Sequence, residues 1–218
     1  LAARGPPDAV RRGVRVRARR ADAGGAWVEG EPGGAFTADI LVGADGIDSA
    51  VRARVFGGAA PVHLGYGSHR FVVANRDGLV HFTEFLGRGQ SVGLVPIGDG
   101  RLYVWTTFDS PAERRPWAAE DGAALRPRFA QFTGARGRGA FAQLTSGEGV
   151  IGTDLEEVHQ SPWVRGRVAL LGDSAHAMSP GLGQGAGMAM EGAAILAEEI
   201  AAASAGARAP EAALVRYE

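Results

Sequence analysis

One stretch constrains the fold more than any other: "RVALLGDSAHAMSPGLGQGAGMAMEGAAILAEEI", from Arg167 to Ile200. Within it, a short apolar run ends at Gly172 and Asp173, and a Gly-rich loop then leads into a long run of small, helix-forming residues. An apolar run without alternation is typical of a strand that is covered on both faces, as in a parallel sheet. The stretch therefore predicts a buried strand, a loop and a helix over about residues 184–203.

A second apolar run, Ile40–Val42, ends in the same way, in "GADG" with Asp45. A short helix is expected after it, with Asp48 or Ser49 as its N-cap and Gly57 beyond its end. Two buried strands, each followed by a helix, should lie parallel in one sheet. Both aspartates would then lie at the carboxyl edge of the sheet, where open α/β sheets bind ligands.

The rest of the chain carries antiparallel strand signals. Residues 14–38 alternate apolar and polar side chains between Gly-rich turns, which predicts a three-stranded meander. Four further runs between about residues 62 and 108 predict an inserted antiparallel sheet, followed by one or two helices and a returning strand. We therefore predict an α/β fold of three segments: 1–57 and 151–218, which share the parallel strands, and 58–150, the inserted lobe.

The residue types at the predicted edge indicate a ligand. A carboxylate at a strand end can accept charge-assisted hydrogen bonds from ribose-like or ribityl hydroxyls. Gly181, Gly183, Gly185 and Gly187 would let backbone N–H groups approach a ligand at a positively polarised helix start. Close packing alone explains the glycines equally well, but it does not explain glycines combined with two strand-end aspartates.

Composition excludes several classes of function. The chain has 218 residues and a formal net charge of −1, which gives no bulk attraction to nucleic acid or membranes. The arginines of "VRVRARRA" follow strand alternation and need no nucleic-acid partner. Cysteine is absent, which rules out a disulfide, a thiolate metal site or a Cys nucleophile. No metal site, no membrane span and a cytoplasmic location are expected; both ends, "LAARG" and "APEAALVRYE", read as interrupted helices of a larger fold.

Two motifs carry a resemblance to a known family. "ADILVGADGIDSAVR" resembles the DG motif, and "RVALLGDSAHAMSPGLGQGAGMAMEGAAIL" the GD motif, of the FAD-dependent aromatic hydroxylases. The similarity is to the p-hydroxybenzoate hydroxylase-like monooxygenases, in their salicylate hydroxylase, urate hydroxylase and zeaxanthin epoxidase branch. The resemblance implies a partial Rossmann-like FAD-binding domain of the glutathione reductase type, in which the inserted sheet is the substrate domain.

The resemblance also implies residue roles. Asp173 would bind the ribityl chain of FAD, Pro180 would lie beside the isoalloxazine ring, and the backbone from Gly183 to Gly187 would contact its pyrimidine edge. Asp45 and Gly46 would serve FAD and nicotinamide binding, with Arg52 supporting that region. The expected cofactor-binding residues are Asp45, Gly46, Arg52, Gly172, Asp173, Pro180, Gly183, Gln184, Gly185, Ala186 and Gly187.

The implied activity is hydroxylation or epoxidation of an aromatic or polycyclic small molecule, with FAD as cofactor, NAD(P)H as reductant and O₂ as co-substrate. The flavin carries the chemistry, so no catalytic side chain is expected, and His176 is expected to orient the loop by hydrogen bonding. Candidate substrate-lining residues are the strand-region side chains His81, Phe82, Phe85, Val95 and Trp105.

The chain departs from the family pattern in three places. Gly187 often corresponds to Asn, Gly192 usually corresponds to Asp, and no G-x-G-x-x-G follows an N-terminal strand to hold the pyrophosphate. Without the strand that carries that loop, the Ile40–Val42 strand would have a bare apolar edge, which a second copy or a partner chain could cover.

Two alternatives stay open. In the first, the chain is a truncated or degenerate family member that folds without holding FAD and has no activity. In the second, "GDSAH", which superficially resembles a nucleophile elbow, provides Ser174 as a hydrolase nucleophile, although His176 stands where that motif has Gly.

Overall fold

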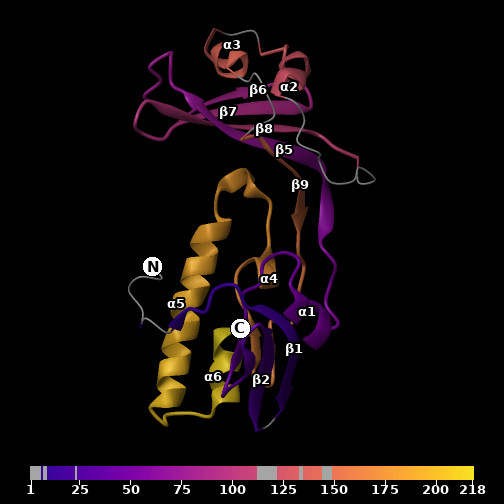
Figure 1. Cartoon of the computed structure of the whole chain (residues 1–218), viewed down its shortest axis with the longest axis vertical. Helices are drawn as coiled ribbons and strands as arrows, with labels where there is room; N and C mark the ends of the chain where they lie inside the picture. Colours follow the sequence, from indigo (N-terminus) through magenta and orange to yellow (C-terminus); the bar gives the residue numbers. More distant parts are fainter. Residues whose placement is uncertain (1–5, 7–8, 23, 112–121, 133–134, 144–148) are drawn as a thin grey trace. The chain divides into compact units, whose positions relative to one another are not determined.

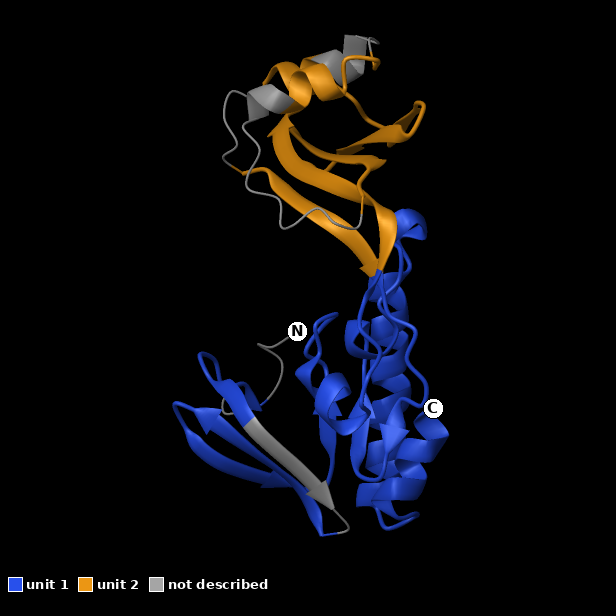
Figure 2. Cartoon of the chain, turned by 90° about the vertical axis from the view of Figure 1, so that its right-hand side faces the viewer, with its two compact units in different colours: residues 1–62, 157–218 blue, residues 63–156 orange. Residues whose placement is uncertain are grey.

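In the computed structural model, the residues described are 6, 9–22, 24–111, 122–132, 135–143 and 149–218. The chain forms two compact units, residues 1–62 with 157–218 and residues 63–156, which Figure 2 colours separately. The second unit corresponds to the predicted inserted lobe, with boundaries a few residues later. That the two units have separate roles stays a prediction. The N-terminal "LAARG" lies outside the described residues.

The first unit begins with the predicted meander. Strands β1 (Arg15–Asp22), β2 (Gly25–Glu31) and β3 (Gly34–Ala38) form an antiparallel sheet in the order β1-β2-β3. The turn into β3 needs Gly33 and Gly34, which have φ values of 136° and 80°, in the region that favours glycine. The alternation of the arginine-rich segment therefore reflects strand structure.

A second sheet of this unit contains both predicted buried strands. Its order is β10 (Val164–Arg165), β11 (Val168–Leu170) and β4 (Leu41–Gly43). β11 and β4 are parallel, with Ala169 opposite Val42, which confirms the prediction. Among the described strands, β4 is the edge of this sheet.

Helices cover both faces of the parallel pair. On one face, Val168 and Leu170 pack with Val51 of α1 (Ala50–Val55) and with Ala175 of α4 (Asp173–His176). On the other face, Ala169 packs against α5 (Gly185–Ser204) and α6 (Pro210–Tyr217). The alternation of β11 side chains between two apolar layers explains the uninterrupted apolar run in its sequence.

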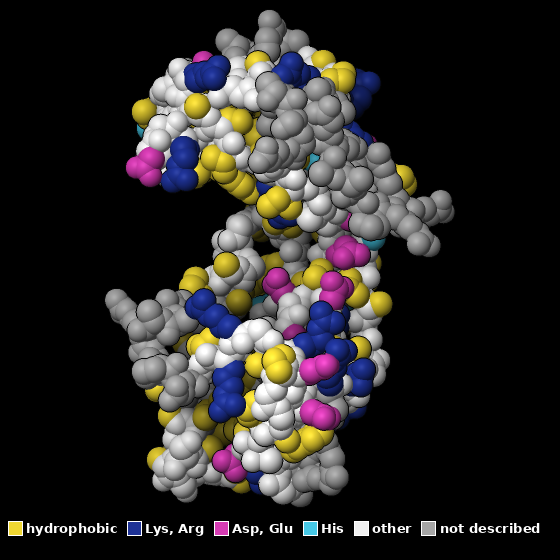
Figure 3. Space-filling model, in the orientation of Figure 1, with side chains coloured by type: hydrophobic (Ala, Val, Ile, Leu, Met, Phe, Trp, Pro, Cys, Tyr) yellow, Lys and Arg dark blue, Asp and Glu magenta, His cyan; other side chains and the backbone are white. Residues whose placement is uncertain are grey.

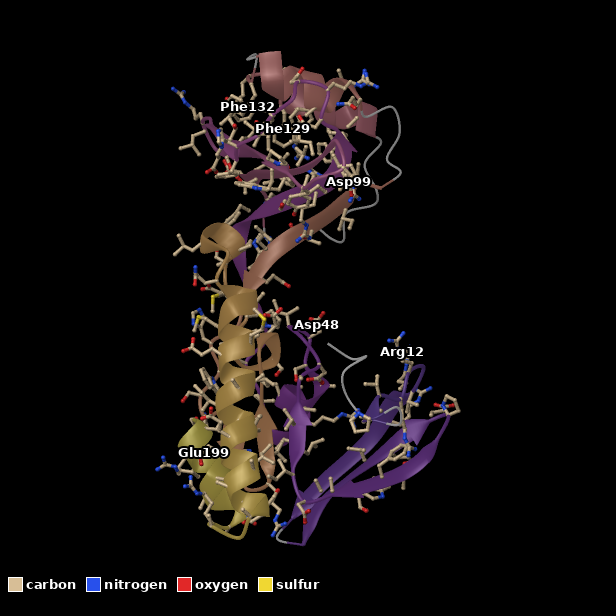
Figure 4. The ribbon with its side chains drawn as sticks, turned by 90° about the vertical axis from the view of Figure 1, so that its left-hand side faces the viewer. Arg12, Asp48, Asp99, Phe129, Phe132 and Glu199 are labelled. Carbon is tan, nitrogen blue, oxygen red and sulfur yellow. The ribbon has the colours of Figure 1, made fainter. Side chains whose placement is uncertain are left out.

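The segments after each strand also agree with the sequence. Ser49 is the N-cap of α1, and its side chain accepts a hydrogen bond from the N–H of Arg52 at 2.9 Å. Asp48, the other candidate cap, lies on the loop before the helix (Figure 4). Between β11 and α5, α4 and a 3₁₀ turn at Pro180–Leu182 replace the continuous loop that the glycines suggested. α5 is the long helix of Figure 1.

The second unit contains a five-stranded sheet in the order β6-β7-β8-β5-β9. All four strand predictions between residues 62 and 108 are confirmed, and a fifth strand, β9, joins them. Because β9 completes this sheet, the sheet extends past the predicted boundary at residue 150. The strands are β5 (Val62–Ala74), β6 (Thr83–Leu86), β7 (Gln90–Pro96), β8 (Arg101–Asp109) and β9 (Ile151–Glu157).

Helices α2 (Gly122–Arg128) and α3 (Ala135–Ala142) cover one face of this sheet (Figure 1). Phe129 and Phe132, after α2, lie between the helices and the strands (Figure 4). Phe129 is fully buried and stacks on Phe141 with ring centroids 5.2 Å apart. The core of this unit therefore combines stacked aromatic rings with aliphatic side chains on the helical side of the sheet.

The surface carries both signs of charge. In Figure 3, basic and acidic side chains are interspersed on the right-hand side of the first unit. Glu199 of α5 forms ion pairs with Arg208 and with Arg216, the latter at 3.1 Å, and so ties α5 to α6. No described helix is both long enough and apolar enough to cross a membrane.

Candidate functional site

A cleft of about 640 Å³ opens in the first unit at the carboxyl ends of β4 and β11. This is the edge at which open α/β sheets bind ligands. The cleft is bounded by the residues that come after the two strands, by the 3₁₀ turn and by the first turns of α5. Its lining residues are Ala44, Gly46, Leu171, Gly172, Asp173, Met178, Pro180, Gly183, Gly185, Ala186 and Ala189.

Small residues keep this cleft open. Gly46, Gly172 and Gly183 have φ values of 80°, 63° and 63°, so the turns that shape the wall favour glycine. A Cβ at Gly172 would lie 3.3 Å from the Cβ of Ala189, which means that helix α5 approaches the strand end closely. Glycine thus serves both packing and access here, and the two interpretations of the glycines are compatible.

Asp173 is the acidic side chain that lines the cleft. It is the first residue of α4, is exposed, and makes no hydrogen bond or ion pair with another described residue. A carboxylate without a protein partner can accept hydrogen bonds from hydroxyl groups of a ligand. Asp173 is therefore where the sequence analysis expected it, with its oxygens available.

The Asp45 carboxylate binds backbone N–H groups of α1. Its Oδ2 accepts hydrogen bonds from the N–H groups of Ala50 at 2.8 Å and Val51 at 3.1 Å, and its Oδ1 accepts one from the Ser49 hydroxyl. The carboxylate thus satisfies the first N–H groups of α1, which have no intrahelical acceptor. Asp45 is not among the cleft-lining residues, whereas its neighbours Ala44 and Gly46 are. The Asp45 carboxylate thus caps α1, and a role of Asp45 in FAD binding stays a prediction.

Arg52 connects the two strand ends. It is 3% exposed, and its guanidinium donates to the backbone carbonyls of Ala59 at 3.0 Å, Ser174 at 3.0 Å and Ile47. Ile47 belongs to the loop after β4, and Ser174 to α4 after β11. Arg52 therefore connects the segment after β4 to the segment after β11. It does not line the cleft.

Ser174 is fully buried, and its hydroxyl joins the same two strands. Its Oγ lies within hydrogen-bond distance of the Gly43 carbonyl and of the Leu171 carbonyl at 2.8 Å, and it accepts from the Leu171 N–H at 3.1 Å. A nucleophile needs access to its substrate, which this hydroxyl lacks. The hydrolase interpretation of "GDSAH" is therefore not supported.

His176 does not orient the loop by a hydrogen bond from Nδ1, because that atom is buried without a partner among the described residues. Its ring instead packs against Trp163, with centroids 5.1 Å apart. The contribution of His176 to the loop is a ring contact, contrary to the expectation.

The start of α5 faces the cleft through Gly185, Ala186 and Ala189. The first N–H groups of a helix have no intrahelical acceptor, and the N-cap residue Gln184 provides no side-chain cap. This end of α5 therefore presents unsatisfied donors and positive polarity to the cleft. Of the predicted residues on this segment, Gln184 and Gly187 do not line the cleft.

Four lining residues were missed by the sequence analysis: Ala44, Leu171, Met178 and Ala189. Ala189 lies one turn after Gly185 and Ala186, so the helical spacing could have identified it. Met178 carries no sequence signal, because its position depends on the turn that the short helix α4 makes.

Tyr217 of α6 contacts the end of β11 beside the cleft. Its hydroxyl donates to the Leu170 carbonyl at 2.9 Å, at the end of β11. Burial, and secondarily the charge of Glu218, raises the pKa of Tyr217 above its ordinary value. A Cβ at Gly192 would lie 3.8 Å from this hydroxyl, so the residue that replaces the family's usual Asp packs beside Tyr217.

The five candidate substrate residues lie in the second unit and do not form one surface. Phe85 packs against the buried core on the helical side of the sheet. Val95 and Trp105 alternate with the core residues Leu94 and Val104, so they lie on the opposite face. His81 and Phe82 are exposed in the loop before β6. Phe85 and Trp105 therefore lie on opposite faces of the sheet, and a role of these residues in substrate binding stays a prediction.

Comparisons with known proteins identify the family of the chain. A family model described as "FAD binding domain" matches residues 2–218. The chain belongs to this FAD-binding family. FAD is thus the cofactor of the family, as the motifs implied.

Curated relatives are similar over most of the chain. The aurachin C monooxygenase/isomerase of Stigmatella aurantiaca is 36% identical over 188 residues, which are 85% of this chain and 48% of the relative. The FAD-dependent urate hydroxylase of Klebsiella pneumoniae is 34% identical over 201 residues, 87% of this chain and 50% of that protein. The chain therefore spans about half the length of the curated relatives it matches.

Solved structures share the fold. HpxO of Klebsiella pneumoniae, in complex with FAD and uric acid, superposes with a TM-score of 0.80 at 31% identity, covering 94% of this chain and 53% of that one. PqsL of Pseudomonas aeruginosa gives a TM-score of 0.76 at 27% identity, covering 94% and 57%. By their printed names, the two curated relatives described above are a monooxygenase/isomerase and a hydroxylase. The solved structures share the α/β fold with an antiparallel sheet.

Proposed function

We propose that the cleft of the first unit binds the isoalloxazine and ribityl part of FAD. The observation that carries this proposal is the unpartnered carboxylate of Asp173 in a glycine-lined cleft opposite the start of α5. Asp173 would accept hydrogen bonds from ribityl hydroxyls, and the polarised N–H groups at the start of α5 would face the ring edge that becomes negative on reduction. The glycine lining of the cleft and the hydrogen-bonding groups at its edge support this proposal.

Within this proposal, each predicted residue has a distinct role. Gly46, Gly172, Gly183 and Gly185 allow the ring system to approach the backbone. Asp45, Arg52 and Ser174 hold the walls of the cleft at the correct separation without touching the ligand. Flavin supplies the redox chemistry when bound, so the protein's part is to orient the ring and exclude water.

We further propose that the protein oxidises an aromatic or polycyclic small molecule with NAD(P)H and O₂. Support comes from the family and from relatives whose names state monooxygenase or hydroxylase activity. NAD(P)H dependence is consistent with a cytoplasmic location. The edge of β4 is not paired with any other described strand, which is consistent with a further strand, from a second copy or from a partner chain, that would complete the sheet.

Reconstitution tests the cofactor proposal. The protein is mixed with FAD, FMN or riboflavin, passed over a desalting column and examined for visible absorbance. Because the proposed contacts are to the ring and the ribityl chain, all three flavins should bind with similar dissociation constants. A colourless protein that ignores all three would contradict the proposal and favour a family member without cofactor.

Activity is tested next with the flavin-loaded protein. Consumption of NADH or NADPH should accelerate in the presence of an aromatic substrate, and one oxygen atom from ¹⁸O₂ should enter the product. Oxidation of NAD(P)H without oxygen incorporation into any aromatic compound would contradict monooxygenase activity while leaving flavin binding intact.

A further inference from the structure

The sulfur atoms of this protein are gathered in one short segment. The sequence has no cysteine and three methionines, which are Met178, Met188 and Met190. This segment runs from the loop after α4, through the 3₁₀ turn, into the first turns of α5, and these elements bound the cleft of the first unit. All thioether side chains of the chain therefore lie at or near that cleft.

Met178 lines the cleft itself. Its side chain is half-buried, and a Cβ placed at Gly185 would lie 3.8 Å from its Cγ, so Met178 reaches the first residue of α5. The other residues that line the cleft are glycines, aliphatic residues and Asp173. Among the described residues that line the cleft, Met178 is therefore the one whose side chain contains an easily oxidised atom.

Met188 and Met190 lie beside the same cleft on α5. Met188 is three residues after Gly185, and Met190 is four residues after Ala186, so each lies one helical turn after a residue that lines the cleft. Helical side chains lean toward the N-terminus of their helix, which here is the end that faces the cleft. Met188 is 43% exposed and Met190 is 63% exposed, so solvent reaches both of them more easily than it reaches Met178.

The chemistry of a thioether makes this arrangement consequential. A hydroperoxide oxidises methionine to methionine sulfoxide. The terminal oxygen of the hydroperoxide forms a bond to sulfur, the O–O bond breaks, and the remaining oxygen leaves with the proton as water or as an alcohol. Sulfur loses two electrons and the hydroperoxide gains them. Reduced flavin and O₂ together are a source of hydroperoxides, including hydrogen peroxide.

We propose that Met178 is a site of oxidative modification, at which a hydroperoxide formed in the cleft converts the thioether to a sulfoxide. This inference rests on the proposed function, because flavin and O₂ supply the oxidant. The sulfoxide places a polar oxygen in an apolar part of the cleft wall, so the modification weakens flavin binding. Methionine sulfoxide reductases reverse the change. Met178 thus makes flavin binding sensitive to oxidant that is not used on a substrate.

The order in which the three methionines are oxidised tests the proposal. Peptide mass spectrometry measures the sulfoxide at each position in the full chain. Hydrogen peroxide added to the flavin-free protein attacks from solvent, so oxidation should follow exposure, with Met190 first and Met178 last. Oxidant formed in the cleft should reverse this order and modify Met178 first.

Cycles of reduction and reoxidation generate that internal oxidant. The FAD-loaded protein is reduced anaerobically with one equivalent of dithionite and returned to air in the dark, with catalase present to remove peroxide from bulk solution. The sulfoxide should accumulate faster at Met178 than at Met190. Flavin-free protein carried through the same cycles is the control for oxidant that dithionite itself produces, and its Met178 should stay reduced.

Two variants test the consequence for flavin binding. Met178→Leu keeps an apolar side chain of similar volume, whereas the matched double variant Met188→Leu, Met190→Leu keeps Met178. After complete oxidation with hydrogen peroxide, the wild type and the double variant should each lose about fivefold in affinity for FAD, relative to the same protein untreated. Met178→Leu should lose none. Methionine sulfoxide reductases should restore the affinity of the oxidised wild type.

Fluorescence titration of the untreated protein with FAD separates the two proposals. A protein that binds no FAD contradicts the proposed function, and the modification proposal fails with it because its oxidant has no source. A protein that binds FAD, but whose Met178 is oxidised no faster than Met190 during the cycles, overturns the modification site and leaves FAD binding intact. An equal loss of affinity in Met178→Leu overturns it as well. If Met178→Leu does not fold, as judged by circular dichroism, the order of oxidation in the wild type decides.

Discussion

The segments that follow β4 and β11 have similar sequences, but their aspartates have different roles. Both strands are short, apolar and parallel, and both are soon followed by an aspartate, Asp45 or Asp173. The Asp45 carboxylate accepts two backbone N–H groups of α1, whereas the Asp173 carboxylate faces the cleft without a protein partner.

The residues after each aspartate explain the difference. After Asp45 the chain enters α1, whose first N–H groups lie within reach and donate hydrogen bonds to the carboxylate. After Asp173 the buried Ser174 hydroxyl bonds the Leu171 N–H and reaches the Gly43 carbonyl, so the strand end is satisfied without the acid. A strand-end aspartate is therefore available to a ligand only when another group satisfies the local backbone.

Arg52 binds backbone carbonyls after both β4 and β11. Its replacement should therefore cause the largest loss of unfolding free energy. Arg52→Met leaves three backbone carbonyls without their donor, that of the buried Ser174 among them, and we expect a loss of about 3 kcal/mol in unfolding free energy. Urea denaturation measures it. Arg54→Met, on the exposed side of the same helix, is the control and should change stability by less than about 0.5 kcal/mol. Equal losses for both variants would contradict the bridging role of Arg52.

Ser174, after β11, and Ser49, after β4, allow the contributions of the two strand ends to stability to be compared. Ser174→Ala removes a fully buried hydroxyl that satisfies backbone groups of both strands, at an expected cost of about 2 kcal/mol. Ser49→Ala removes the cap of α1, at an expected cost of about 1 kcal/mol. Thermal and urea unfolding compare them. A larger loss of unfolding free energy for Ser49→Ala than for Ser174→Ala would contradict the structural role of the Ser174 hydroxyl. Labelling of Ser174 by a fluorophosphonate probe would contradict it as well.

Tyr217 reinforces only the β11 end. Tyr217→Phe removes the donor to the Leu170 carbonyl, and we expect a loss of about 1 kcal/mol at neutral pH. Because burial raises the pKa of Tyr217, the stability that the protonated hydroxyl contributes is complete below about pH 10 and is lost as pH rises through the folded-state pKa. Unfolding measured from pH 7 to pH 11 should show the difference between wild type and variant shrinking above pH 10. A constant difference would contradict this account.

The smallest change in unfolding free energy is expected for the ion pair between Arg167, just before β11, and Glu211 of α6. Glu211 at the start of α6 has its pKa lowered by its own backbone N–H and by Arg167, whose Nε lies 2.6 Å from Glu211 Oε1. A lowered carboxyl pKa gives stability that is present above about pH 4 and is lost as pH falls through the folded-state value. Glu211→Gln should therefore remove a small acid-dependent part of stability, measured by urea unfolding at pH 7 and pH 3. An identical pH dependence in the two proteins would contradict this contribution.

Sequence reasoning predicted the elements better than the contacts of the site. The parallel pair, the meander and the inserted sheet could be predicted from hydrophobic periodicity and from turn residues, which depend on local sequence. The Ser49 cap and α5 were predicted by the same rules. The short helix α4 was missed, because a four-residue helix leaves too little periodicity to detect.

The site was predicted in part, for a physical reason. Asp173, Gly172 and Pro180 line the cleft as expected, because the motif fixes their positions relative to β11. Asp45 does not, because a strand-end motif cannot show whether a helix start nearby will take its carboxylate. Phe85 lies on the opposite face from Trp105, because the face of a residue depends on register, which aromatic content does not reveal.

The most direct test compares the two aspartates in flavin binding. Asp173→Asn removes the charge that faces the cleft, whereas Asp45→Asn removes the charge that caps α1. Fluorescence titration with FAD should show a loss of affinity of about tenfold or more for Asp173→Asn, with unchanged unfolding free energy. Asp45→Asn should bind FAD nearly as the wild type does and lose about 1 kcal/mol of stability. Full flavin affinity in Asp173→Asn, or an equal loss of affinity in both variants, would contradict the account.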